Sequence, residues 1–264
     1  MWLLRNSLFY FAILLLTSEV SFGLVGLSAF QTGHSDILKN YNRFVKQGVP
    51  EEALTRSLEV FYQAFGRHLK LKADSESHVL RYKNDKYMVI IDYSKPSTEK
   101  RFYLLNLSKG SVEKHYVAHG IKTGGVHAYR FSNIVDSLQT SLGFYITGSQ
   151  YVGKFGPSLK LYGLDDSNDN AYARYIVIHG AWYVSPEFIK EKGRLGLSHG
   201  CPALEKSVAK RLIPLLQSGT LVYAYHKDLS DRALKDPLYQ SLRDDNPPED
   251  EPDYMHGELE QLPY

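Results

Sequence analysis

One cysteine dominates the chemistry that this sequence could perform. Cys201 is the only cysteine among 264 residues, and it ends the run SHGC, which begins at Ser198. A thiol nucleophile needs a base to take its proton and a group that orients the base. His179 should lie at the end of a strand, where Gly180 would let the chain turn. His179 could be that base, with the Gly180 carbonyl holding its second ring nitrogen. The competing interpretation is an inert cysteine, because free thiols are among the most buried side chains.

The residues around the cysteine favour a reactive thiol. Gly200 would let the backbone approach closely, so that the amides of Gly200 and Cys201 could bind an oxyanion, with Ser198 and His199 shaping the pocket. Pro202 suits the first position of a helix or a turn, and a helical turn there would favour the thiolate. His199 is a second candidate base, although a tight glycine-containing turn leaves the direction of its side chain open.

Other polar clusters predict less. The spacing of His115, His119 and His127 fits no helix-borne zinc motif, so no metal is expected there. The glycines between Gly120 and Gly125 lack a following Gly-Lys-Ser/Thr, which argues against a nucleotide loop. A net charge of +2 gives no reason to expect a nucleic-acid partner. The sequence therefore predicts a site that works without a cofactor.

Short β-rich runs are expected to position these residues. With 20 tyrosines and few long helical patterns, the sequence predicts an α+β fold that is mainly β, a mixed sheet or β-sandwich. Two helices should interrupt the strands: one begins at Ser185-Pro186 and stops at Gly193, and one covers Glu205 to Gln217. The expected strands are Tyr87–Tyr93, Phe102–Leu107, Val112–His119, Gly143–Gly148, Leu159–Leu164, Tyr175–His179 and Thr220–Tyr225.

Composition divides the chain into four parts. Residues 1–30 carry Arg5, a nine-residue apolar run and then small residues, which predicts a signal peptide or, if uncleaved, an N-terminal anchor. Residues 31–78 should form a helical preface of two short helices, with Pro50 at a first helical position. Residues 79–227 would be the catalytic domain. Residues 228–264 carry eleven acidic against three basic residues and several prolines, which predicts a disordered acidic tail.

The ordered motifs resemble a known family. His179-Gly180, followed by SHGC at Cys201, resembles the signature of the L,D-transpeptidase catalytic domain of the YkuD type. Further matching stretches are IDYSKPSTEKRFYLLNL, VAHGIKTGG, FSN, TSLGFYITG and VIHGAWYVSPEFIKEKGRLGLSHGCPAL, and together they span about residues 80–226. Several blocks in order are far more specific than SHGC alone.

The resemblance implies a role for each matching residue. Cys201 corresponds to the nucleophile, His179 to the general base and acid, and Gly180 to the orienting carbonyl; Ser198, His199 and Gly200 would shape the oxyanion pocket. Two departures stand out. The spacer from His179 to Ser198 holds eighteen residues, slightly more than usual, and Pro202-Ala203 stand where many members place an Arg or Asn. Arg194 is a possible substitute for that substrate contact.

By this resemblance, the expected function is that of an exported cysteine acyltransferase acting on peptidoglycan stem peptides in the periplasm or cell envelope. A Cys201 thioester would release D-Ala and pass the acyl group to an amine, giving a 3→3 cross-link, or to water. Alternatives are a cysteine hydrolase (an L,D-carboxypeptidase or a peptidase that releases wall-linked protein), a transferase joining an amine-bearing protein to the wall, and a non-catalytic wall-binding module. Membrane contact would involve only residues 1–30.

Overall fold

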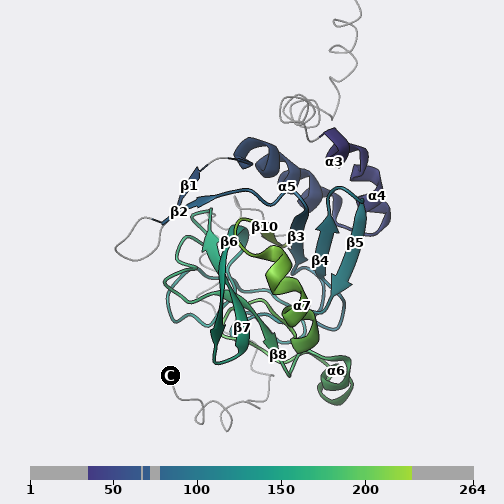
Figure 1. The fold of residues 1–264 in the computed structure, drawn as a ribbon. Coiled ribbons are helices and arrows are strands. Elements are labelled where there is room, and N and C mark those ends of the chain that lie inside the picture. The colour runs from purple at the N-terminus through teal and green to yellow at the C-terminus, as the bar shows by residue number, and fades with distance from the viewer. Residues whose placement is uncertain (1–34, 67, 72–77, 228–264) are drawn as a thin grey trace, which may run out of the picture.

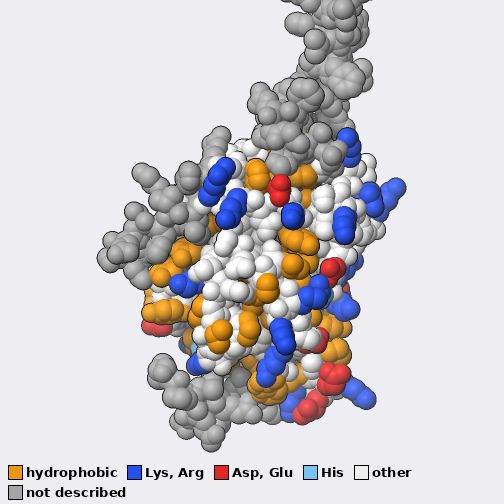
Figure 2. All heavy atoms as spheres, viewed as in Figure 1, with side chains coloured by type: hydrophobic (Ala, Val, Ile, Leu, Met, Phe, Trp, Pro, Cys, Tyr) orange, Lys and Arg blue, Asp and Glu red, His pale blue; other side chains and the backbone are white. Residues whose placement is uncertain are grey.

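The structure is a computed structural model that describes residues 35–66, 68–71 and 78–227 (Figure 1). The predicted signal segment and the predicted acidic tail lie outside these residues. No helix in the described ranges is long and apolar enough to cross a membrane. On the face shown in Figure 2, lysine and arginine side chains are spread among polar and apolar groups rather than gathered in one stripe.

An eight-stranded mixed sheet organises the molecule, in agreement with the predicted mainly β fold. Its order is β5-β4-β3-β10-β6-β7-β8-β9 (Figure 1). The bounds are β3 Tyr87–Asp92, β4 Phe102–Asn106, β5 Ser111–His115, β6 Gly143–Gly153, β7 Gly156–Gly163, β8 Val177–Ala181, β9 Ala203–Glu205 and β10 Leu221–Tyr225. A separate antiparallel pair joins β1 (His68–Leu71) to β2 (His78–Arg81).

The ends of the sheet approach each other. After β5 the chain forms a bridge to β9, the strand at the opposite edge of the sheet, through Ala118 and Ala203. A second bridge joins Gly120 to Ser198, in the segment before Cys201. These two bridges nearly close the sheet into a barrel. The candidate nucleophile therefore lies beside the seam where the two edges of the sheet meet.

Side chains alternate between two cores because strand residues point to opposite faces in turn. Along β3, Met88 and Ile90 face one core, while Val89 and Ile91 face the other. The first core includes residues of α4 (Tyr41–Lys46) and α5 (Glu51–Ala64). The second is covered by α7 (Lys206–Leu216), which crosses the sheet in Figure 1 and buries four residues, Ala209, Leu212, Ile213 and Leu216.

The helices partly follow the sequence prediction. Two helices were predicted in residues 31–78, and the described part of this segment has three, since α3 (Ser35–Lys39) precedes α4. Pro50 takes the N-cap position of α5 rather than the first helical position, and Glu51 and Glu52 fill the first turn, where carboxylates oppose the helix dipole. In α6 (Pro186–Lys192) the predicted ends are confirmed: Ser185 accepts a hydrogen bond from the Phe188 amide, and Gly193 ends the helix in a left-handed conformation.

Candidate active site

Cys201 precedes β9 by two residues in the sequence, and its thiol lies beside the first residue of β8, Val177. The Val177 amide donates a hydrogen bond to Sγ over 3.5 Å, and the thiol lies 3.6 Å from the Tyr175 carbonyl, to which it donates. The side chain is partly buried against the core beneath α7. Burial raises the pKa of Cys201 to about 11, while the Val177 amide and the charge of Arg174 act in the opposite direction. On its own, then, this thiol is protonated at neutral pH.

His179 lies inside β8, where its neighbours across the ladders are Ser158 of β7 and Ala203 of β9. Because Ala203 follows Cys201 by two residues, the sheet register brings the histidine and the cysteine to one region. Nδ1 of His179 lies 3.2 Å from the Gly180 carbonyl. A carbonyl can only accept, so Nδ1 carries the proton and Nε2 keeps its basic lone pair.

The surroundings of His179 favour the neutral ring. The side chain is 2% exposed, and burial lowers its pKa below the ordinary value, with the Gly180 carbonyl opposing the shift. Phe155, in the turn between β6 and β7, stacks on the His179 ring with ring centroids 4.5 Å apart. Among the described residues no hydrogen bond joins His179 to Cys201 directly. Since a neutral imidazole with a free Nε2 is the form that can accept a proton, the ring is held ready to act as a base.

Gly180 occupies a different position from the one predicted. It lies within β8, which continues to Ala181, rather than in a turn at the strand end. The reason is packing against α7, since a Cβ on Gly180 would lie 3.0 Å from the Cα of Lys206 and 3.2 Å from the Cβ of Ala209. Glycine at this position lets α7 approach the strand while the carbonyl remains available to His179.

Ser198 holds the loop before Cys201 in shape. Its hydroxyl donates to the Cys201 carbonyl at 2.7 Å and accepts from the Gly200 amide at 3.1 Å. The Gly200 amide is therefore already occupied. The Cys201 amide has no hydrogen-bond partner in the part of the chain that the structure describes, which leaves it as the donor available to an oxyanion.

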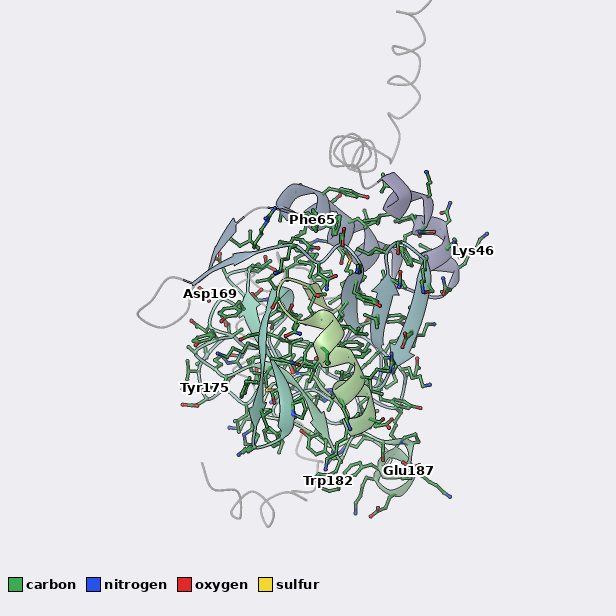
Figure 3. All side chains as sticks on the ribbon, in the orientation of Figure 1. Lys46, Phe65, Asp169, Tyr175, Trp182 and Glu187 are labelled. Atoms are coloured by element: carbon green, nitrogen blue, oxygen red, sulfur yellow. The ribbon has the colours of Figure 1, made fainter. Side chains whose placement is uncertain are left out.

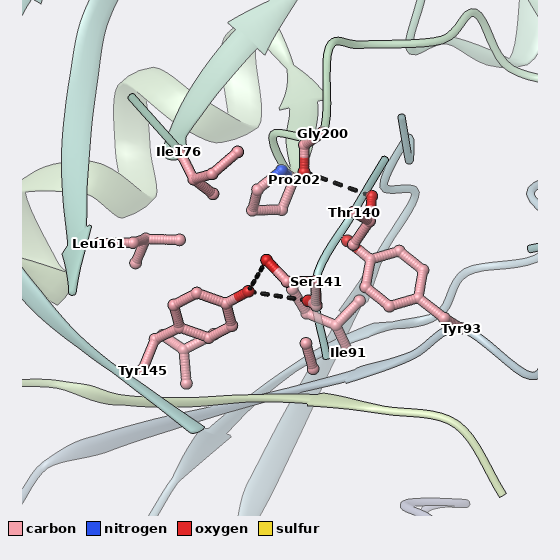
Figure 4. Close-up of a pocket in the computed structure, with 11 residues that line it drawn as sticks. Ile91, Tyr93, Thr140, Ser141, Tyr145, Leu161, Ile176, Gly200 and Pro202 are labelled. Carbon is pink, nitrogen blue, oxygen red and sulfur yellow. Dashed lines mark hydrogen bonds between the residues drawn. The ribbon is translucent and has the colours of Figure 1, made fainter. Parts of the chain in front are cut away.

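Gly200 allows a backbone path that other residues rarely adopt. Its φ is +114°, and a Cβ there would lie 2.7 Å from the Gln139 carbonyl oxygen. Thr140 Oγ1 donates to the Gly200 carbonyl over 3.3 Å, as drawn in Figure 4. The cavity behind this loop measures about 10 Å³, enough for no more than about one water molecule, so the loop is packed from below.

The chain after Cys201 does not form a helix. Pro202 leads directly into β9, and α7 starts only at Lys206. Of the two possibilities at Pro202, a helix or a turn, the helix is therefore not formed, and no helix N-terminus stabilises the thiolate. The pairing of Ala203 with both His179 and Ala118 keeps this segment extended.

His199 and Arg194 both lie apart from the thiol's hydrogen bonds. The side chain of His199 is exposed. Neighbouring groups still remove part of the water around its ring, and this desolvation and the charge of Lys154 lower the pKa of His199. Arg194 donates from Nη1 to the carbonyl of its neighbour Leu195 at 2.9 Å. Among the described residues neither side chain forms a hydrogen bond with Cys201.

Arg174 was missed in the sequence and lies close to the candidate nucleophile. It precedes β8 and is partly buried, and a Cβ on Gly200 would lie 3.3 Å from its Nη2. An arginine three residues before a strand resembles an ordinary solvated charge. Only its hydrogen bonds with the segment 132–141, some forty residues earlier, mark it as part of the site.

A second missed pair supports the loop from inside the protein. Arg101 and His119 are fully buried, and Nη2 of Arg101 lies 2.7 Å from Nδ1 of His119. Because a guanidinium can only donate, His119 is neutral, with its proton on Nε2 facing the Gly124 carbonyl at 2.9 Å. The backbone carbonyl of His119 accepts from the Ser198 amide at 2.9 Å, which connects the pair to the loop that carries Cys201.

The aromatic residues near the site lie at two edges. Trp182 follows β8 and meets Phe188 of α6 edge-on at 5.6 Å, and Figure 3 places it beside the helix that carries Glu187. Tyr175 lies away from α6, before β8, with a left-handed φ of +53° and 82% exposure. In the described ranges no three His, Cys, Asp or Glu side chains gather as a metal site would require.

Comparison with known proteins identifies the family of the chain. A sequence model of the L,D-transpeptidase catalytic domain matches residues 57–225, well over half of the chain. No curated protein matches significantly. Solved structures give weaker matches, among them an L,D-transpeptidase from Mycobacterium smegmatis, with 11% identity, a TM-score of 0.35 and coverage of 61% of this chain and 68% of that one.

Two further solved structures are similar to the chain at the same level. L,D-transpeptidase 3 from Mycobacterium tuberculosis has 14% identity and a TM-score of 0.31, with 61% of this chain and 69% of that chain covered. Bd1075 of Bdellovibrio bacteriovorus has 16% identity and a TM-score of 0.34, with 67% and 60% covered. The matched family model carries the assignment, and it supports a peptidoglycan-modifying activity. The chain belongs to the family of the L,D-transpeptidase catalytic domain.

Proposed function

We propose that the protein is an exported cysteine acyltransferase that remodels peptidoglycan through a thioester on Cys201. The observation that carries the proposal is the state of His179. Its Nδ1 proton faces the Gly180 carbonyl, so the neutral ring offers Nε2 as a base from the strand next to the segment that bears the thiol. Family membership supplies the substrate class, the peptide stems of the cell wall.

The first half of the proposed reaction forms the thioester. His179 takes the thiol proton, and Sγ attacks the carbonyl between the third stem residue and D-Ala. The Cys201 amide binds the oxyanion that forms, while Ser198 and Gly200 hold that amide in place. The imidazolium then gives its proton to the leaving amine, and D-Ala departs as the C–N bond breaks.

The second half transfers the acyl group. An incoming amine loses its proton to His179 and attacks the thioester carbonyl. The C–S bond breaks, and the Cys201 thiolate leaves and takes the proton back from the imidazolium. With the side-chain amine of another third residue as acceptor, the product is a 3→3 cross-link. An amine on a wall-linked protein would use the same chemistry. Cysteine, histidine and backbone amides suffice for each step.

The test uses purified protein and a tetrapeptide stem. Mass spectrometry should detect an acyl adduct on the wild type that matches loss of D-Ala, and Cys201→Ala should form none while keeping its circular dichroism spectrum. Products then report the acceptor: a cross-linked dimer indicates transfer, and a tripeptide alone indicates hydrolysis. D-Ala release by a folded Cys201→Ala protein would overturn the proposed mechanism.

A further inference from the structure

Arg174 presents a fixed cation beside the loop that carries Cys201. Nη1 donates to the Ser132 carbonyl at 2.6 Å and to Ser141 Oγ at 3.0 Å. Nη2 donates to Ser137 Oγ at 3.1 Å and, in a very short bond, to the Gln139 carbonyl. Four acceptors from one segment therefore hold the guanidinium in a single orientation.

All four acceptors are neutral oxygen atoms, so the positive charge is not cancelled. Within the described ranges Arg174 forms no ion pair; Asp136 lies near enough to raise its pKa, but not at ion-pair distance. Burial lowers the pKa of Arg174, yet an arginine stays protonated at neutral pH. A partly buried cation without a counterion is suited to an anion that forms only during a reaction.

The thiol is the group positioned to become that anion. Gly200, which directly precedes Cys201, packs against both Arg174 and the Gln139 carbonyl that Arg174 holds. Three tyrosines lie close enough for a Cys201 thiolate to raise their pKa further, and they are neutral at pH 7; they are Tyr93, Tyr151 and Tyr183. The neutral ring of His179 adds no positive charge either. Since β9 rather than a helix follows Pro202, no helix dipole supplies the missing positive potential.

We propose that Arg174 is a positioning residue that stabilises the thiolate of Cys201 by its fixed charge and braces the 132–141 segment against Gly200. The proposal rests on Cys201 being the nucleophile. In this proposal, the charge of Arg174 lowers the pKa of the thiol, as a helix N-terminus does at many reactive cysteines. Its four hydrogen bonds would keep the charge in place while substrate enters.

The test measures the thiol without any substrate. The rate of alkylation of Cys201 by iodoacetamide is followed against pH for the wild type, Arg174→Gln and Arg174→Lys. Both variants lose the forked hydrogen bonds, but only glutamine removes the charge. We expect the midpoint of the pH profile to rise by about one unit in Arg174→Gln and to stay near the wild-type value in Arg174→Lys. Thermal unfolding is recorded for each protein.

The matched control is Arg211→Gln, which removes an exposed arginine paired with Glu113 and should leave the midpoint unchanged. An unchanged midpoint in Arg174→Gln, or equal shifts in both Arg174 variants, would overturn the proposal. If Arg174→Gln does not fold, the folded Arg174→Lys protein is acetylated on its lysines beside an acetylated wild type. The midpoint should rise only in the variant, and equal profiles would contradict the assignment.

The two proposals fail separately. Alkylation measures the reactivity of the thiol alone. A shifted midpoint in a protein that releases no D-Ala would therefore support the role of Arg174 and contradict the proposed substrate. Normal D-Ala release with an unshifted midpoint would retain the transpeptidase chemistry and reject the role of Arg174.

Discussion

His179 and His199 differ in what surrounds each ring, although both are candidate bases for the same cysteine. His179 is buried, has its tautomer set by the Gly180 carbonyl and lies under Phe155. His199 is exposed, and its ring makes no hydrogen bond with another described residue. A base whose proton position is fixed in advance loses less orientational freedom when it acts.

We therefore expect His179→Gln to slow acylation by about 10² to 10⁴-fold, the usual effect of losing a general base. His199→Gln, the matched control, should cost less. Because burial lowers the pKa of His179 below 6.5, the ring stays neutral as the pH falls through that value, so the acid limb of the wild-type rate should lie below pH 6.5. Single-turnover acylation rates between pH 4 and 9 measure both effects. A greater loss in His199→Gln would reverse the two roles.

Sequence reasoning selected candidate residues by the chemistry that is visible in their type, and it missed buried polar residues whose partners are distant in the sequence. Cys201, His179 and the ends of α6 follow from local patterns. Arg174 and Arg101 look like solvated charges in the sequence, because their acceptors come from other segments. Gly180 was expected in a turn, since nothing local reveals that α7 packs against it. Local patterns predict elements, whereas tertiary hydrogen bonds decide which polar residues become buried.

At the scale of elements, the extended segment after β5 that contains His119 makes the stability of the fold depend on pH. Burial first, and then the charge of Arg101, lower the pKa of His119 to about 3, against 6.5 for an ordinary histidine. Between these values the unfolded chain binds a proton that the folded protein does not. The contribution to stability is therefore complete above pH 6.5 and is lost as the pH falls toward 3, at up to about 1.4 kcal/mol per pH unit.

We expect urea unfolding to show this loss in the wild type between pH 6.5 and 4, and His119→Asn to have a shallower dependence on pH. At pH 7 the variant should already be about 1–3 kcal/mol less stable, because partners of the ring lose hydrogen bonds. The control is His127→Asn, at an exposed position in the following loop. Equal slopes for wild type and His119→Asn would show that His119 titrates normally in the folded protein.

At the scale of the molecule, α5 and the sheet share one core. Phe61 is fully buried; it stacks on Phe65 at 5.0 Å and meets Tyr82 edge-on at 5.6 Å, while the same cluster includes Met88 and Tyr223 of the sheet. The predicted division at residue 78 remains a prediction. The shared core implies, however, that the helices contribute to the stability of the sheet that carries the site.

Phe61→Ala should therefore destabilise the whole domain by about 3–5 kcal/mol, the usual effect of deleting a buried phenylalanine ring. Unfolding is followed in urea by circular dichroism and by the exposure of Cys201 to alkylation, and the two transitions should coincide. The control Phe188→Ala, on the partly exposed side of α6, should cost much less. Two separate transitions, with the thiol still protected after the helices unfold, would contradict this expectation.

The central position of β10 has a consequence for how the chain acquires its activity. β10 joins β3 in parallel and β6 in antiparallel fashion, so the last strand of the fold connects the early part of the sheet to the later part. The seam at Gly120–Ser198 and Ala118–Ala203 also needs residues late in the chain. Contacts so distant in sequence form slowly. A chain that is still being synthesised thus contains His179 before it contains Cys201 and β10, and the segments around the candidate site can come together only after synthesis has passed residue 225.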